Sequence, residues 1–187
     1  MTFFDSIKRG LRLIKLDGDA AVEIASDSGS TVNGWLVIFV AGLLGSLAIS
    51  IKQVPFSFLD YLTNLGYSIV FSALAILIIH GLAKLFGGQS TLIGYFRAQS
   101  HAHLLNWISI VTAVELAYVG NLVGWAISLW SIIISVVVLK NVHRLSTWKA
   151  IIVALAIPLI LLVLVLIGAL AYFGVLSPDK FLPSNVA

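Results

Sequence analysis

The sequence contains no cysteine, which excludes disulfide bonds, thiolate metal sites and a cysteine nucleophile. Charge is also scarce: 10% of the residues are charged, 60% are hydrophobic, and the mean hydropathy is +1.08. A chain of 187 residues with this composition would not dissolve in water as a globular protein. A soluble fold is therefore excluded, and we expect an integral membrane protein.

Catalytic motifs are missing as well. The sequence has no nucleophile elbow, no HExxH pair, no phosphate-binding glycine loop and no paired carboxylates. The stretch Gly87-Gly88-Gln89-Ser90-Thr91 has glycines, but it lacks the Lys-Ser/Thr pair of a phosphate loop and is typical of a helix end followed by a helix N-cap. We expect no enzymatic activity, no cofactor, no bound metal and no nucleic-acid partner.

Long apolar runs are what the sequence has in abundance. The 42 residues between Arg97 and Lys140 carry one formal charge, at Glu115. One helix of that length, at about 1.5 Å per residue, would be twice the ~30 Å thickness of the hydrocarbon core, so we expect a turn at Gly120-Asn121. Because a lipid-embedded backbone must satisfy its own hydrogen bonds, the spans are expected to be helices. The prediction is an all-α polytopic bundle of five transmembrane helices, at 34–54, 61–83, 100–119, 121–139 and 150–174.

Basic residues are divided unequally between the two sides of this bundle. One side has two, Lys52 and Lys180. The other side has nine, namely Lys8, Arg9, Arg12, Lys15, Lys84, Arg97, Lys140, Arg144 and Lys149. The positive-inside rule predicts a cytoplasmic N-terminus and an external C-terminus. The expected organisation is a cytoplasmic segment at 1–30, a membrane domain at 31–175 and a short external tail at 176–187.

An amphipathic helix is predicted at the N-terminus, and its charges interrupt any signal-peptide core. Its apolar stripe, about 100° wide, consists of Phe3, Phe4, Ile7, Leu11 and Ile14. The adjoining basic arc consists of Lys8, Arg9, Arg12 and Lys15. We expect this helix to lie in the cytoplasmic membrane interface with its basic side chains at anionic lipid headgroups. It either anchors the terminus beside the bundle or docks a partner protein.

Residues 17–28 are acidic and join this helix to the first span. Asp19 is the expected N-cap of a short helix that runs through Val22 and Ile24. Ser28-Gly29-Ser30 is the expected linker.

Ionisable residues inside spans are costly, so they are the first functional candidates. Glu115 lies about one turn from the expected outer turn, where it either carries a proton or cation or makes a helix-end hydrogen bond. His80, His101 and His103 lie near the cytoplasmic ends of neighbouring spans and could approach one another. Because His101 and His103 point about 200° apart on a helix, we favour interfacial hydrogen bonds over a zinc site. His143 is expected at the surface.

Small residues form faces on two spans at the spacing typical of close helix packing. One face consists of Gly42, Ser46 and Ser50, and the other of Gly120, Gly124 and Ser128. We favour packing within one bundle over a subunit interface, because five helices must bury several faces among themselves.

Three segments give the chain a family resemblance. They are Leu16-Asp17-Gly18-Asp19 to Glu23-Ile24-Ala25, then Gly87-Gly88 and Ser90-Thr91 leading to Tyr95 and Arg97, and finally Val142-His143-Arg144-Leu145-Ser146-Thr147-Trp148-Lys149-Ala150. With these the chain resembles the Yip1-domain family of five-span membrane proteins over roughly residues 16–170. Family members often carry proline where Gly18 and His103-Leu104 stand here.

The resemblance implies a membrane protein without an accepted catalytic motif. Eukaryotic members look like vesicle-trafficking adaptors that contact prenylated small GTPases. This chain lacks their long cytosolic N-terminal region and looks more like the compact prokaryotic form, archaeal or bacterial, so GTPase binding is not carried over. We therefore expect a multi-pass protein of a prokaryotic cell membrane.

Two classes of function remain. We favour a non-enzymatic scaffold, adaptor or accessory subunit that associates with other membrane subunits or with itself. The alternative is a small-solute or ion transporter or channel using Glu115 and His80. The discriminating feature is whether His80, Asn106 and Glu115 line one continuous path or face separate neighbours.

Overall fold

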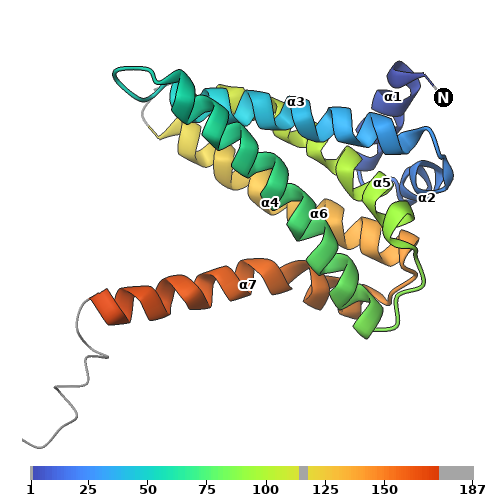
Figure 1. Cartoon of the computed structure of the whole chain (residues 1–187). Helices are drawn as coiled ribbons and strands as arrows, with labels where there is room; N and C mark the ends of the chain where they lie inside the picture. Colours follow the sequence, from blue (N-terminus) through green and yellow to red (C-terminus); the bar gives the residue numbers. More distant parts are fainter. Residues whose placement is uncertain (1, 114–117, 173–187) are drawn as a thin grey trace, which may run out of the picture. The chain divides into compact units, whose positions relative to one another are not determined.

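Helices make up most of the part of the chain that the computed structural model describes, residues 2–113 and 118–172 (Figure 1). In chain order they are α1 (Phe3–Ile14), α2 (Gly18–Ser26), α3 (Ser30–Ser50), α4 (Phe58–Leu85), α5 (Leu92–Ala102), the 3-10 helix η1 (His103–Ala113), α6 (Val119–Val142) and α7 (Thr147–Tyr172). These ranges contain no strand, which confirms the predicted all-α class.

Four helices are long and apolar enough to cross a membrane: α3, α4, α6 and α7 as far as Ala171. They correspond to the first, second, fourth and fifth predicted spans. The third, at 100–119, is not one α-helix: it comprises the end of α5, then η1, and then residues 114–117, outside the described ranges. An eleven-residue 3-10 helix is unusually long, since such runs rarely exceed four residues.

The 3-10 geometry aligns the polar residues of η1. Side chains three positions apart eclipse one another in such a helix. One row of η1 is therefore formed by His103, Asn106, Ser109 and Thr112. η1 lies against α3 and α6, and the four residues of this row are half-buried.

The predicted turn at Gly120-Asn121 is wrong, because both residues lie in the first turn of α6. Tyr118, with φ +67°, precedes that helix as its N-cap. The small residue at position 120 serves close packing instead, since a Cβ on Gly120 would lie 2.7 Å from the carbonyl oxygen of Thr112.

The predicted helix end at Gly87-Gly88 is confirmed. The Gly88 amide donates to the Ala83 carbonyl at 2.8 Å and the Gly87 amide donates to the Lys84 carbonyl at 3.0 Å, which together form a Schellman motif. Gly87 adopts φ +90°, a conformation that glycine tolerates without a Cβ penalty. Thr91 then caps α5, and its Oγ1 accepts a hydrogen bond from the Gly94 amide at 3.1 Å.

Both N-terminal helices begin with side-chain caps. Thr2 and Asp5 form a capping box at the start of α1. The cap of α2 is Asp17 and not Asp19, because the Asp17 carboxylate accepts from the amides of Asp19 and Ala20. Asp19 stands in the first turn, where a carboxylate also favours the helix dipole.

Residues up to Ala154 form one compact unit, and the rest of α7 belongs to a second. The first unit buries its largest side chains where α1, α2, α3, α5 and α6 meet. Among those that are fully enclosed are Leu13, Ile24, Val37, Tyr95 and Leu139. The N-terminal helices are therefore part of the packed protein, because α1 and α2 contact α5 and α2 contacts α6.

Candidate functional site

His80 lies in an aromatic cluster formed by α4, α5 and the residue that follows α6. Its Nδ1 atom is 3.2 Å from Nε2 of His143. The ring centroid of Tyr95 lies 6.0 Å from that of His80 and 5.0 Å from that of His143. The cluster joins residues 63 positions apart in sequence, and it does not include His101 or His103.

The expectation that His143 lies at the surface is wrong, because its side chain is fully buried. Burial, and secondarily the positive charges of His80 and Lys84, lowers the pKa of His143 to about 4. The imidazole is therefore neutral at physiological pH. Gly88 makes room for it, since a Cβ at Gly88 would lie 2.5 Å from Nδ1 of His143. That Nδ1 atom has no hydrogen-bond partner among the described residues.

His101 anchors the N-terminal helix. Its Nδ1 atom is 2.7 Å from the carbonyl oxygen of Arg97, which can only accept, so Nδ1 carries the proton. Nε2 is then an acceptor, and it receives the hydroxyl proton of Ser6, a fully buried residue of α1. His103 instead bonds to Asn106 within η1, at 3.2 Å. In residues 2–113 and 118–172 no three side chains are grouped as a metal site requires.

Arg97 fastens α5 to the N-terminal segment. Its Nε donates to Oγ1 of Thr31 at 2.7 Å, and its Nη1 donates to the carbonyl oxygen of Ala25 at 3.2 Å. These bonds secure both ends of the link between α2 and α3. Arg97 is one of the nine basic residues that predicted the orientation in the membrane. In the structure it also holds α5 to the segment between α2 and α3.

A buried polar pair that the sequence did not reveal joins α5 to α6. Nε2 of Gln99 donates to Oγ of Ser135 at 2.9 Å, and both residues are buried. The Tyr95 hydroxyl lies 3.4 Å from Oε1 of the same glutamine. The signal available was that Gln99 lies one helical turn from Tyr95, but spacing alone does not identify a partner on another helix.

Two of the four basic residues expected at lipid headgroups have carboxylate partners inside the protein. Arg9 lies 3.2 Å from Asp27, and Arg12 lies 2.8 Å from Asp17 and 3.0 Å from Glu23. The backbone amide of Ala20, followed by the Arg12 guanidinium, lowers the pKa of Asp17. The other two basic residues, Lys8 and Lys15, are exposed.

The small residues of α3 face neighbouring helices. A Cβ on Gly42 would lie 3.1 Å from Cδ1 of Leu65 on α4, which is tight contact. Ser46 and Ser50 are buried, and neither hydroxyl has a hydrogen-bond partner among the described residues. Leaving a buried hydroxyl without a partner costs about 1–3 kcal/mol.

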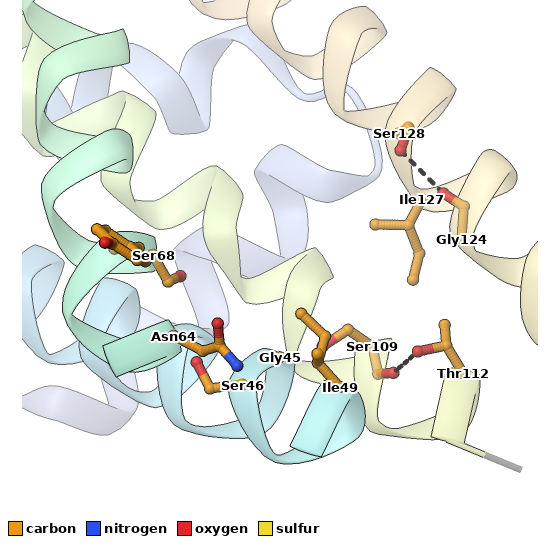
Figure 2. A pocket seen from close by; sticks show the side chains of 11 residues that line it. Gly45, Ser46, Ile49, Asn64, Ser68, Ser109, Thr112, Gly124, Ile127 and Ser128 are labelled. Atoms are coloured by element: carbon orange, nitrogen blue, oxygen red, sulfur yellow. Dashed lines mark hydrogen bonds between the residues drawn. The ribbon is translucent and has the colours of Figure 1, made fainter. Parts of the chain in front are cut away.

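The small residues of α6 do not all pack against a helix. Among the described residues, no atom outside the local backbone of α6 lies within 4 Å of a Cβ added at Gly124, whereas Gly120 approaches η1 closely. Gly124 and Ser128 instead line a cavity that Ser46 also lines (Figure 2). Glu115, the remaining predicted site residue, lies outside the described residues.

Comparison with known families decides how this helical chain is classified. A family model described as the Yip1 domain matches residues 16–170. The chain belongs to the Yip1 domain family. Membership implies a membrane-associated, non-catalytic role. No curated protein and no solved structure matches the chain.

The Yip1 segments that carried the resemblance meet in the structure. The amide of Gln89 donates to the carbonyl oxygen of His143 at 3.0 Å, and Nζ of Lys149 donates to the carbonyl oxygen of Phe86 at 3.0 Å. The loop after α4 and the loop after α6 are therefore joined by backbone as well as by the aromatic cluster. In this Yip1 domain the two loops therefore lie side by side.

Proposed function

We propose that the chain is a non-enzymatic, multi-pass membrane scaffold, adaptor or accessory subunit. The observation that carries this proposal is that His80 and Asn106, two of the three residues named as the possible lining of a transport path, bond to different neighbours. His80 bonds to His143 across two helices. Asn106 bonds to His103 within η1. A transporter normally has a continuous polar lining or interrupted helix pairs, whereas these groups face separate neighbours.

The length of the α5–η1 segment supports five crossings. Eleven α-helical residues rise about 16 Å and eleven 3-10 residues about 22 Å, so the segment is about 38 Å long, against a hydrocarbon core of ~30 Å. A fifth crossing puts the termini on opposite sides. The basic residues then favour a cytoplasmic N-terminus, with the C-terminus outside.

An exposed stripe of α1 is the proposed contact surface at the cytoplasmic face. It consists of Phe4, Lys8, Leu11 and Lys15, at the spacing of one helical face. Phe4 is 75% exposed and Leu11 is 49% exposed. Because buried contacts of Ser6 and Leu13 hold the opposite side of α1, the stripe is presented in a fixed orientation. Alternating apolar and basic groups suit anionic lipid headgroups and an amphipathic surface on another membrane subunit or a second copy.

Photo-crosslinking in native membranes tests the scaffold. A photoreactive residue at Phe4 or Leu11 should give discrete protein adducts in addition to lipid adducts, identified by mass spectrometry. The same residue at Leu164 of α7, also exposed, is the matched control and should give lipid adducts alone. Identical lipid-only patterns at all three positions would remove the support for a partner-binding scaffold.

Ion flux tests the alternative. Wild-type protein and Glu115→Gln are reconstituted in proteoliposomes, since glutamine keeps the shape and hydrogen-bonding capacity of the carboxylate and removes its charge. We expect no flux from either protein. Reproducible wild-type flux that disappears in Glu115→Gln would replace the scaffold with a transporter or channel.

A further inference from the structure

A cavity of about 480 Å³ lies among four elements of the first unit: α3, α4, η1 and α6 (Figure 2). Gly45 and Gly124 contribute no side chain, which leaves the space between the helices open. Hydrogen-bonding side chains line much of it, namely Ser46, Asn64, Tyr67, Ser68, Ser109, Thr112 and Ser128. Serine and threonine also serve helix packing, but Asn64 and Tyr67 are not small, so packing alone does not explain this polar wall.

Two hydroxyls of this wall have no hydrogen-bond partner in the part of the chain that the structure describes. Ser46 is 2% exposed, and neither its Oγ nor the buried Oγ of Ser109 has a hydrogen-bond partner among the described residues. Thr112 and Ser128 differ, because they donate to the carbonyl oxygens of Ser109 at 2.6 Å and Gly124 at 2.9 Å and keep only acceptor capacity. Ser46 and Ser109 line the cavity but their Oγ atoms are enclosed, so a change of χ1 rotamer would bring these free donors beside the acceptors of Thr112 and Ser128, as a hydroxyl-bearing ligand requires.

The aliphatic part of α7 cannot satisfy these hydroxyls. Its residues 155–171 carry no side chain with a hydrogen-bonding group. A bare ion does not suit the cavity either, since no charged side chain lines it in the described part of the chain. An uncharged group with several hydroxyls fits the lining best.

A positive charge stands next to this neutral cavity. A second cavity, of about 380 Å³, is also lined by Thr112, Gly124 and Ser128, and Lys52 is its charged residue. The first cavity thus continues toward the loop between α3 and α4. A ligand that occupied both cavities would therefore carry an anionic group at Lys52, joined to a hydroxyl-rich group beside Ser46 and Ser109.

We propose that these adjoining cavities bind a polyol phosphate, with the phosphate at Lys52 and the hydroxyls at Ser46 and Ser109. Such a group comes either from a membrane phospholipid with a polyol headgroup or from a soluble polyol phosphate. Binding of this kind goes beyond a scaffold role, because it gives the protein a ligand of its own.

Native mass spectrometry of the full-length protein in detergent tests the proposal with three probes. Phosphatidylglycerol has a polyol headgroup, phosphatidylserine has the same net charge without a polyol, and glycerol phosphate is the soluble source. We expect one phosphatidylglycerol per chain to be retained in preference to phosphatidylserine. Retention of glycerol phosphate would support the soluble source instead. Equal retention of both lipids without glycerol phosphate binding, or retention of no probe, would overturn the proposal.

Matched variants locate the ligand. Gly124→Leu fills the cavity and Lys52→Gln removes the charge, and each should weaken retention by at least about tenfold. Gly81→Leu and Lys140→Gln are the controls, at a helix position with equally open space and at an exposed lysine in the last turn of α6, and should bind as wild type does. Unchanged binding in Gly124→Leu would refute the site.

Ser46→Ala tests ligand binding at the cavity if Gly124→Leu prevents folding. It removes a hydroxyl without adding bulk, so the protein should fold, as checked by circular dichroism. The expected result is weaker retention of the polyol probe with no loss of thermal stability. Unchanged retention would mean that the hydroxyl does not contact the ligand, and the proposal would fail.

Discussion

Three glycines near the end of α4 should respond to alanine in three different ways. Gly81 has no atom within 4 Å of an added Cβ, so Gly81→Ala should stabilise the helix by up to about 1 kcal/mol. Gly87 also has open space, but its φ of +90° is strained for an L side chain, and Gly87→Ala should cost about 1–2 kcal/mol.

Gly88→Ala should be the most damaging of the three. Its Cβ would lie 2.5 Å from Nδ1 of His143, 2.7 Å from the carbonyl oxygen of Ala83 and 3.0 Å from the carbonyl carbon. The imidazole could turn aside, but the backbone of Ala83 belongs to α4 and cannot move without breaking the Schellman motif. Overpacking of this kind costs about 1–3 kcal/mol, to which the lost contacts of the aromatic cluster add.

Thermal unfolding in one detergent, followed by circular dichroism, measures the order of the three variants. A second comparison separates the two clashes at Gly88. Adding His143→Ala to Gly88→Ala removes the side-chain clash and leaves the backbone clash, so the double variant should stay less stable than His143→Ala alone. If Gly88→Ala unfolds at the same temperature as Gly81→Ala, the packing described for this loop is wrong.

Further predictions concern pH, salt and the attachment of α1. The pKa of His143 is about 4 in the folded state and about 6.5 in the unfolded state. The free energy of unfolding should therefore fall as pH drops from about 6.5 to 4 and level off below pH 4. His143→Gln should reduce that slope in unfolding titrations. Arg12→Gln should lower stability slightly at low salt and have less effect at high salt, as Glu23→Gln should, because their ion pair is exposed and screened. Leu13→Ala should cost about 2–5 kcal/mol in thermal or denaturant unfolding, whereas Leu11→Ala, at a half-exposed position, should cost much less.

Features of the fold that depend on local chemistry could be predicted from the sequence. Hydropathy located four helices of spanning length, because lipid permits few alternatives to a helix. The Gly87-Gly88 helix end was predictable because only glycine adopts that backbone without strain. The cap of α2 was misplaced by two residues, since Asp17 and Asp19 are chemically identical and spacing does not choose between them.

Tertiary pairing was beyond the sequence. His143 was assigned to the surface because a histidine in a polar connector has no local reason to be buried, and its partner His80 is 63 positions away. Arg9 and Arg12 were assigned to headgroups for the same reason, since the acidic residues that bind them lie within α2 or cap its ends. One signal was present and unused: the polar residues of η1 recur every third position, which is the period of a 3-10 helix.

That period makes the polar row of η1 dependent on its winding. A 3-10 helix turns about 120° per residue and an α-helix about 100°, so rewinding η1 as an α-helix would rotate Thr112 by about 180° relative to His103. The rise would also shorten, by about 0.5 Å per residue, drawing the far end inward by about 4–5 Å. Ser109 and Thr112 would then leave the cavity wall while His103 stayed in place. The polar surface between α3 and α6 thus depends on the pitch of one helix, η1. A contact that favoured the looser α-helical winding would remove this surface, and one that favoured the tighter 3-10 winding would keep it.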